Sequence, residues 1–358
     1  MKNEKLIWET LEKLVDSHRS EGAEASVTDR FRRFVEEGYR DGVFGVSRHH
    51  HYVVLLEMLL RYYRVQDRPV PPVRAFDDGM LMDFRQFLQD ECQYARARGL
   101  PADELSEKVR GGNTVVSDMK MLRTFFSDLE DRDEIHKSPF RRLGAERRRA
   151  VMRTQYDDPV FLRREEFRAV LETEVPETLR KTRDAFILQC TLGCRISDFQ
   201  RLTMDNVAIS AEGIPYIHYL PVKTSRSVSL RKEVETPLIH TARLIVDRYK
   251  FDFPILRYAR GEDGYNRRIK QLLRLAGINR LVALFDPGTG TNRYLPLYEV
   301  GSSKLCRKTF VDMMSKVQVN LYASGLHKAG SEAVHRYTCL ELADRYSLMC
   351  AAFEDRRR

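Results

Sequence analysis

Hydrophobic residues in the first 66 positions recur at the three- and four-residue steps typical of amphipathic helices. The spaced positions are Ile7, Leu11, Leu14, Phe31, Phe34, Val35, Val54, Leu55, Met58, Leu59 and Tyr62. Three prolines (Pro69, Pro71, Pro72) follow almost together and break any helix. The pattern therefore predicts an N-terminal helical domain over residues 1–66.

Helical spacing resumes between Phe76 and about Leu143. Leu81, Phe84, Phe87 and Leu88 form one apolar face, and Val116, Met119, Leu122, Phe126 and Leu129 form another. Asn113 is placed to cap the second of these helices, and Ser138-Pro139-Phe140 closes the segment. We expect a second helical domain over residues 74–143.

The hydrophobic pattern after residue 157 combines helical and strand-like segments. Residues 162–171 and 182–192 have helical patterns, and Gly193 is a good C-terminal stop for the second helix. Residues 214–220 alternate as a strand does, and the alternation resumes from Val228 after a break at 225–227, which predicts a hairpin. Helical patterns return at 305–322 and from Ser331 onward. The sequence thus predicts a mainly α fold with a small antiparallel β-sheet, in which an α+β domain over 157–358 follows the helical ones.

Composition narrows the class of protein. Hydrophobic residues make up 42% of the 358 positions, which is enough for folded cores, and no run of 18 apolar residues is present to span a membrane. The charged N-terminus lacks the apolar block of a signal peptide, and the six cysteines form no C-x-x-C pair. We therefore expect a cytoplasmic protein with free thiols. The net charge of +9 indicates a polyanionic partner.

Much of this charge is concentrated in one segment. Residues 141–153 hold six arginines and one glutamate, and we interpret residues 144–156 as a basic linker between folded domains. A solvated linker is the simple interpretation, but a strap along a phosphate backbone fits the charge better. The expected DNA contacts are Arg147, Arg148, Arg149 and Arg153, together with Lys120 and Arg123 on the preceding helix.

Residues suited to phosphate chemistry follow in the last half. They are Arg195 in the turn T-L-G-C-R-I-S-D, Lys223 on the hairpin, Lys304 and Arg307 at the start of a helix, His327 and Tyr337. Each alone has an ordinary explanation, such as an Arg195–Asp198 ion pair or a solvated lysine. Lys304 and Arg307 lie on one helical face, where two like charges favour an anion between them.

The order and spacing of these residues resemble the tyrosine recombinases (phage-type integrases). YDDPVFLRREEFRAVL and RDAFILQCTLGCRISDFQRLTMDNV are similar to the start of their catalytic domain, and NTVVSDMKMLRTFF with SPF resembles their core-binding domain. The overall style of the sequence is most similar to that of integrases from conjugative or mobilisable elements of Bacteroidetes. The resemblance implies a site-specific recombinase of a mobile element. It would act on double-stranded DNA as a homotetramer on two sites, in the nucleoid, with possible accessory DNA-bending proteins. The domain over 1–66 would then be a candidate for binding arm-type sites.

The resemblance also implies a role for each residue. Tyr337 would attack the phosphate to give a 3′-phosphotyrosyl intermediate, Arg195 and Arg307 would stabilise the transition state, and Lys223 would protonate the departing 5′ oxygen. His327 would hydrogen-bond a phosphate oxygen, and Asp198 would support the arginine. The family's chemistry needs no cofactor and no metal.

Some positions depart from the family's pattern. Lys304 stands where histidine is usual, and at neutral pH an ordinary lysine is protonated and a poor general base. Lys304 would then contact the phosphate. The long hairpin makes Lys232 an alternative proton donor, and the long interval before Tyr337 makes Tyr346 an alternative nucleophile. A catalytically silent DNA-binding protein of the same fold and a topoisomerase-like strand relaxer stay open as alternatives.

Two histidine and cysteine patterns could suggest metal sites. His49-His50-His51 are consecutive, so their side chains point in different directions and chelate poorly. Cys190 and Cys194 lie one helical turn apart without a partner pair of ligands, and core packing accounts for them better. The apolar residues after Tyr337 fit either docking on a neighbouring protomer or packing on their own domain.

Overall fold

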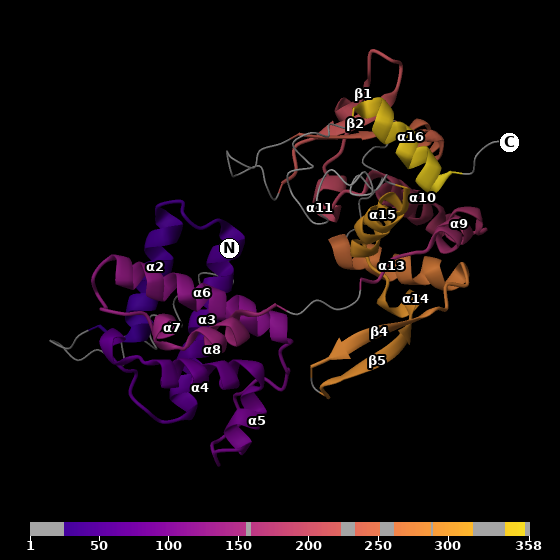
Figure 1. Ribbon diagram of the computed structural model, residues 1–358. Coiled ribbons are helices and arrows are strands. Elements are labelled where there is room, and N and C mark those ends of the chain that lie inside the picture. Colours follow the sequence, from indigo (N-terminus) through magenta and orange to yellow (C-terminus); the bar gives the residue numbers. More distant parts are fainter. Residues whose placement is uncertain are drawn as a thin grey trace, which may run out of the picture. The chain divides into compact units, whose positions relative to one another are not determined.

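The structure is a computed structural model that describes residues 25–154, 159–222, 233–250, 261–287, 289–317 and 341–354 (Figure 1). Of the 261–263 segment only the backbone is described. The chain divides into two compact units, the first comprising residues 1–157 and 285–292 and the second comprising residues 158–284 and 293–358. Each unit has its own hydrophobic core.

The first unit is helical and is built around one aromatic-rich core. Its elements are α2 (Val27–Arg40), α3 (Val46–Val65), a 3₁₀ turn (Val73–Ala75), α4 (Asp78–Gln89), α5 (Glu91–Arg96), α6 (Gly112–Asp131), α7 (Pro139–Arg142) and α8 (Ala145–Met152). Phe31 of α2 packs edge-on against Phe125 of α6 with 4.8 Å between ring centroids. Both rings are fully buried, so α2 and α6 share the interior.

The predicted boundary between residues 66 and 74 does not separate two compact units. The prolines follow the end of α3, as expected, but the chain then pairs with the segment before α2. The Val27 amide donates to the Pro71 carbonyl at 2.9 Å, and the Val73 amide donates to the Ala25 carbonyl at 3.3 Å. Proline stops a helix without stopping the packing around it, so described residues of 1–66 and 74–143 form one unit.

Two local predictions also need correction. Residues 145–152 of the predicted basic linker form helix α8, and Val151 is buried in the core of the first unit. The arginines of α8 are therefore held on a packed helix. The N-cap of α6 is Gly111, and Asn113 lies inside the first turn. The apolar stripe at residues 7–14 lies outside the described residues.

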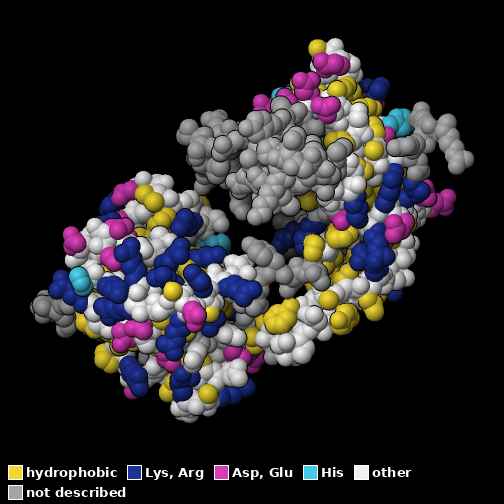
Figure 2. Space-filling model, viewed as in Figure 1, with side chains coloured by type: hydrophobic (Ala, Val, Ile, Leu, Met, Phe, Trp, Pro, Cys, Tyr) yellow, Lys and Arg dark blue, Asp and Glu magenta, His cyan; other side chains and the backbone are white. Residues whose placement is uncertain are grey.

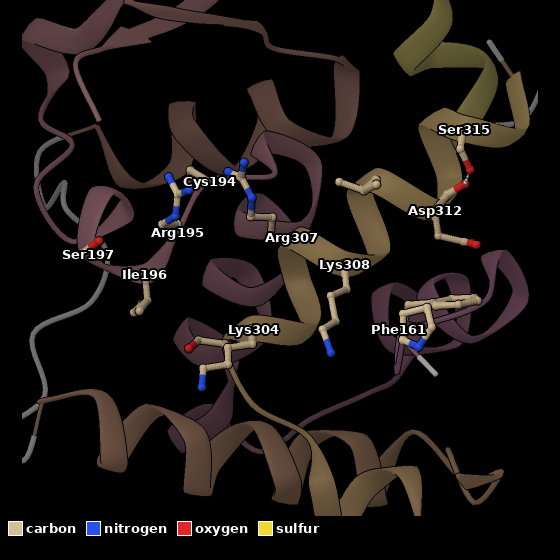
Figure 3. A pocket seen from close by; sticks show the side chains of 13 residues that line it. Phe161, Cys194, Arg195, Ile196, Ser197, Lys304, Arg307, Lys308, Asp312 and Ser315 are labelled. Carbon is tan, nitrogen blue, oxygen red and sulfur yellow. Dashed lines mark hydrogen bonds between the residues drawn. The ribbon is translucent and has the colours of Figure 1, made fainter. Parts of the chain in front are cut away.

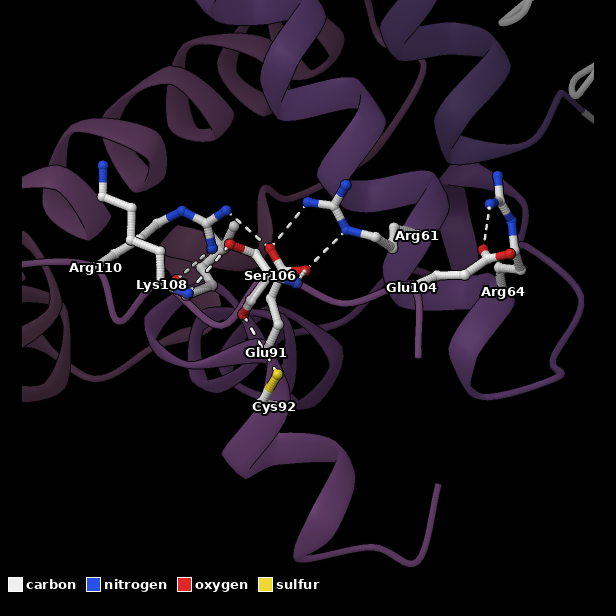
Figure 4. Close-up of polar contacts among 9 residues, drawn as sticks. Arg61, Arg64, Glu91, Cys92, Glu104, Ser106, Lys108 and Arg110 are labelled. Atoms are coloured by element: carbon white, nitrogen blue, oxygen red, sulfur yellow. Dashed lines mark hydrogen bonds and ion pairs between the residues drawn. The ribbon is translucent and has the colours of Figure 1, made fainter. Parts of the chain in front are cut away.

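A buried carboxylate ties α3 to the segment that leads into α6. Glu91 is fully buried and accepts hydrogen bonds from Arg61 at 2.8 Å and from Arg110 at 2.8 Å, while the Ser106 amide donates to it at 3.2 Å (Figure 4). Burial opposes ionisation of Glu91, but the Arg61 and Arg110 hydrogen bonds outweigh it and lower its pKa. Removing one partner of such a pair costs about 3–5 kcal/mol, because the other charge stays buried.

Asp118 on α6 gives this unit a pH-dependent stability. Burial raises the pKa of its carboxyl to about 6, against the opposing charge of Arg110. The folded state therefore holds this proton more tightly than the unfolded chain, and stability falls as the pH rises from about 4 to 6 and stays reduced above that. We expect Asp118→Asn to remove this dependence and to stabilise the protein at pH 7.5 by about 1–2 kcal/mol. Thermal unfolding of both proteins between pH 4 and 7.5 measures the pH dependence of stability. The same dependence in wild type and in Asp118→Asn would contradict the prediction.

The second unit packs helices around α10, with two small sheets. Its elements are α9 (Arg164–Glu172), α10 (Glu177–Leu192), α11 (Ile196–Phe199), a 3₁₀ turn (Met204–Asn206), β1 (Val207–Ile209), β2 (Pro215–Tyr219), β3 (Val234–Pro237), α12 (His240–Tyr249), α13 (Gly261–Leu275), β4 (Leu281–Asp286), β5 (Thr291–Pro296), α14 (Leu297–Val300), α15 (Lys304–Val317) and α16 (Leu342–Phe353). Strands β1, β2 and β3 form an antiparallel sheet in that order. Strands β4 and β5 form a hairpin that extends away from the helices of this unit (Figure 1).

The C-terminal helix α16 packs on its own unit. Met349 and Phe353 are buried in the second core, and the Phe353 ring contacts those of Phe167 and Phe310. At its end, Glu354 accepts hydrogen bonds from the backbone amide and the hydroxyl of Thr241 at 2.9 and 3.2 Å. The sequence left two alternatives for this segment, docking on a neighbouring protomer or packing on its own domain. The described part packs on its own domain. None of the described helices is long and apolar enough to cross a lipid bilayer.

Candidate active site

Arg195 is placed by a tight turn between α10 and α11. Helix α10 ends at Gly193, whose φ of 62° is left-handed, and the Phe310 ring of α15 lies against this glycine. A Cβ on Gly193 would come within 2.5 Å of the Phe310 ring, so only glycine fits both the backbone angle and the space. Arg195 follows as the N-cap of α11 and is 37% exposed, which leaves its guanidinium accessible.

Helix α15 brings the other cations to the same place. Its buried face carries Leu305, Cys306, Thr309 and Met313, and α10 lies against it. The other face of α15 carries three exposed cations, Lys304, Arg307 and Lys308. Arg307 Nη1 donates to the Gly193 carbonyl at 3.1 Å, so this arginine is tied directly to the turn before Arg195.

These cations line one cavity of about 810 Å³ (Figure 3). Its lining includes Arg195, Lys304, Arg307 and Lys308, with apolar and small residues (Pro159, Phe161, Ile196, Ser197, Val311) alongside. The acidic group in this lining, Asp312, is ion-paired with Lys316 at 2.5 Å. The described part of the cavity is therefore strongly positive, and its two arginine forks suit a phosphate oxyanion.

Asp198 supports this arrangement from behind. Its side chain is almost completely buried, and Oδ2 lies 4.0 Å from Arg195 Nη1. Oδ1 accepts a hydrogen bond from the Val222 amide at 3.0 Å. Asp198 therefore links the Arg195 turn to the segment that follows strand β2 and leads to Lys223. The sequence allowed two interpretations of this pair, an ordinary ion pair or a supporting role for Asp198. Both refer to this one contact between Arg195 and Asp198.

Four of the predicted residues, namely Lys223, its alternative Lys232, His327 and Tyr337, lie outside the described residues. Their roles stay predictions. The alternative nucleophile Tyr346 is described, and it lines a different cavity of about 500 Å³ between α9, α12 and α16. It is absent from the lining around Arg195 and Arg307, so the geometry does not favour Tyr346 as the attacking group.

Cys194 also borders the cavity but is no candidate for the nucleophile. Its side chain is fully buried, and burial, followed by the charge of Asp198, raises the pKa of its thiol. A neutral buried thiol is unreactive. Cys190 is likewise fully buried, in agreement with core packing. In the first unit, His49 is buried and stacks on Tyr39.

The predicted DNA contacts of the first unit lie on its surface. Lys120 and Arg123 are exposed on α6, Arg147 and Arg149 on α8, and Arg153 just beyond it, whereas Arg148 is half-buried. Lys120 Nζ lies 3.2 Å from the Thr154 hydroxyl, which places it next to the end of α8. Figure 2 shows Lys and Arg side chains spread over the visible face of this unit.

Sequence reasoning missed Lys308. It lies one helical turn after Lys304 and lines the same cavity, and no ion pair to it is found among the described side chains. The signal was available in the i, i+4 spacing of the two lysines on a helix already expected to bind an anion. Sequence reasoning also missed Gln189, Tyr265 and Asn266. Their hydrogen bonds hold the two arms of the site, which are the turn that bears Arg195 and the helix α15 that bears Arg307.

No family model matches the sequence, and no curated protein matches it either. Solved structures do match. Residues 75–356 of lambda integrase, as a dimer bound to a COC′ core site, are 13% identical with a TM-score of 0.52, covering 90% of this chain and 96% of that one. Residues 82–397 of the Tn1549 transposon integrase, in complex with circular intermediate DNA, are 14% identical with a TM-score of 0.51 and cover 91% and 99%.

A lambda integrase tetramer bound to a Holliday junction is 12% identical with a TM-score of 0.52, and the match covers 91% of this chain and 88% of that one. These likenesses extend over nearly the whole length of both partners. The chain therefore has the integrase fold, mainly helical with small antiparallel sheets, as the sequence predicted.

Proposed function

We propose that this protein is a tyrosine-type site-specific DNA recombinase, the integrase of a mobile genetic element. The observation that carries the proposal is the meeting of Arg195 and Arg307, far apart in sequence, at one cationic cavity. The proposal draws further support from the fold, which is shared with two integrases solved on DNA. Membership of the tyrosine recombinases, and of their Bacteroidetes branch, is part of the proposal.

The proposed reaction conserves the energy of the phosphodiester bond. The Tyr337 oxygen attacks phosphorus, a P–O bond to tyrosine forms, and the bond to the 5′ oxygen breaks. Lys223, or Lys232 in its place, gives the leaving oxygen its proton, and His327 hydrogen-bonds a phosphate oxygen. Arg195 and Arg307 stabilise the charge that gathers on the non-bridging oxygens. A free 5′ hydroxyl from a partner strand then reverses the step.

Lys304 fits this scheme as a second contact to phosphate. It lines the cavity and is exposed, and an ordinary lysine stays protonated at neutral pH. A positive charge there adds to the field of the two arginines without accepting a proton. The proton of the attacking phenol would then pass to water or another acceptor.

A trapped covalent intermediate tests the function. Duplexes taken from the DNA beside the coding sequence, carrying a nick near the presumed crossover, are incubated with the full chain. We expect a protein–DNA adduct on denaturing gels with wild type and none with Tyr337→Phe, because the variant lacks the attacking oxygen. Tyr346→Phe is the matched control and should leave the adduct in place. An adduct that survives Tyr337→Phe would contradict the assignment of the nucleophile.

The same experiment separates the alternatives. Specific binding with no adduct on any of these duplexes would leave a catalytically silent DNA-binding protein, which the replacement of the usual histidine by Lys304 favours. An adduct with relaxation of supercoiled DNA but no joint molecules would indicate a topoisomerase-like enzyme. Joint molecules between two sites establish recombination.

The arginines around α8 provide a second test. We expect replacement of Arg147, Arg149 and Arg153 with alanine to weaken duplex binding and flatten its salt dependence, because each lost phosphate contact lowers the log–log slope by about 0.9. Affinity measured over a several-fold range of salt concentration checks this. A matched control replaces Arg180, Arg243 and Arg345, which are ion-paired to neighbouring carboxylates. Equal slopes in wild type and the first variant would rule out contact between this segment and DNA.

The assembly belongs to the same proposal. Four copies would act on two recombination sites in the cytoplasm, at the nucleoid, with accessory DNA-bending proteins where the site needs bending. Residues 1–66 would contribute a surface for accessory arm-type sites. The core-binding part would lie in the first unit and the catalytic part in the second.

A further inference from the structure

A buried hydrogen-bond relay runs from α13 to the backbone beside Arg195. The Tyr265 hydroxyl donates to Gln189 Oε1 at 3.1 Å, and Gln189 Nε2 donates to the Cys194 carbonyl at 3.4 Å. Tyr265, Gln189 and Cys194 are all fully buried. The relay therefore ends at the peptide group that joins Cys194 to Arg195, deep behind the cavity.

The next residue of α13 holds the other arm of the site. Asn266 Oδ1 accepts a hydrogen bond from the Ser303 amide at 2.8 Å, and Ser303 is 2% exposed. Ser303 immediately precedes α15, so this contact fixes where the helix bearing Lys304 and Arg307 begins.

A further hydrogen bond joins the two arms directly, so that the contacts from α13 to each arm and the contact between the arms form a closed ring. Arg307 Nη1 donates to the Gly193 carbonyl, two residues before Arg195. Each step in the ring is a directional contact, so consecutive residues of one helix set the relative position of the two arginine-bearing elements. Helices α13 and α15 both pack against α10 in the second unit (Figure 1).

Packing alone does not require these polar groups. A phenylalanine would fill the volume of Tyr265, and an apolar side chain could replace Gln189 in a fully buried position. A buried amide with both ends satisfied is instead held in one orientation, and loss of one partner leaves an unsatisfied group. The relay therefore specifies the direction of the Cys194 carbonyl more than it adds to the core.

We propose that Tyr265 and Asn266 are positioning residues that hold Arg195 and Arg307 in register around the phosphate. The inference rests on the proposed function for its catalytic consequence. Neither residue touches the substrate: Tyr265 acts through Gln189, and Asn266 acts through the start of α15. A displacement of about 1 Å in such groups is enough to slow a phosphate reaction severely.

The test combines single-turnover adduct formation on a nicked duplex with affinity for the same DNA. We expect Tyr265→Phe and Asn266→Leu to slow adduct formation about tenfold while the Kd for DNA changes less than about twofold. Asn266→Asp keeps the accepting oxygen and should stay within about twofold of wild type. Tyr249→Phe is the matched control, because it removes a hydroxyl that donates to buried Asp184 on the α12 side of the unit.

Hydrogen exchange gives a readout independent of catalysis. Asn266→Leu should speed exchange of amides at 303–307, and Tyr265→Phe should speed exchange at 194–199, with the helix α9 unchanged. Wild-type rates in both variants, or an equal loss in Tyr249→Phe, would overturn the inference while the proposed function stands. Absence of any adduct with wild type would overturn the proposed function, and the catalytic role of the two residues with it.

Discussion

Replacing Arg307 with alanine is expected to slow formation of the covalent DNA adduct about a thousandfold, while duplex binding changes only a few-fold. Arg307 has two roles in the structure. Its exposed fork lines the cationic cavity, and its Nη1 donates to the Gly193 carbonyl at 3.1 Å. Alanine removes the charge that stabilises the phosphate oxygens in the proposed reaction, and it removes the hydrogen bond to the turn that places Arg195. Single-turnover kinetics on a nicked duplex measure the loss.

Two further variants make the result specific. Arg307→Lys keeps the positive charge but loses the planar two-point fork, so we expect it to recover only part of the rate. Arg243→Ala is the control in the same unit, because Arg243 of α12 is paired with Asp247, both side chains are exposed, and neither lines the cavity. It should react within about twofold of wild type, given the small contribution of exposed ion pairs. A near-normal rate in Arg307→Ala would remove the main support for the proposed chemistry.

Local signals predicted the elements that carry the site. The end of α10 at Gly193, strand β2 and the start of α15 beside Lys304 lie where the pattern placed them. Helix α13 went unnoticed although Tyr265, Ile269, Leu272 and Leu273 are buried at helical spacing. The division near residue 66 failed for another reason: prolines report on backbone continuity, whereas unit boundaries depend on which side chains share a core.

The site itself was only partly accessible to sequence reasoning. The cations were found from their order along the chain, since an arginine at a helix junction and a K-x-x-R pair are visible locally. Their supports were not, because Tyr265 meets Gln189 and Asn266 meets Ser303 only after three helices pack. Such contacts have no spacing rule. A residue that orients a distant backbone group looks, in sequence, like any other core position.

Gly193→Ala is expected to lower the free energy of unfolding by about 2–4 kcal/mol, because two penalties coincide. The alanine must adopt a φ of 62°, and its Cβ must enter a space where the Phe310 ring lies 2.5 Å away. Gly213→Ala separates the two penalties, since Gly213 has a φ of 79° and a Cβ added there would meet no atom within 4 Å. This control should lose about 1 kcal/mol through backbone strain alone.

A double variant then identifies the clash. In Gly193→Ala/Phe310→Ala the ring is gone, so the combined loss should be smaller than the sum of the single losses by about 1–2 kcal/mol. Urea unfolding of wild type, the two single variants and the double variant measures this coupling. The same displacement should move Arg195, so adduct formation should fall in Gly193→Ala and stay near wild type in Gly213→Ala. Additive losses would mean that Phe310 yields freely, and that the turn before Arg195 is held by its hydrogen bonds to Arg307 and Gln189 instead.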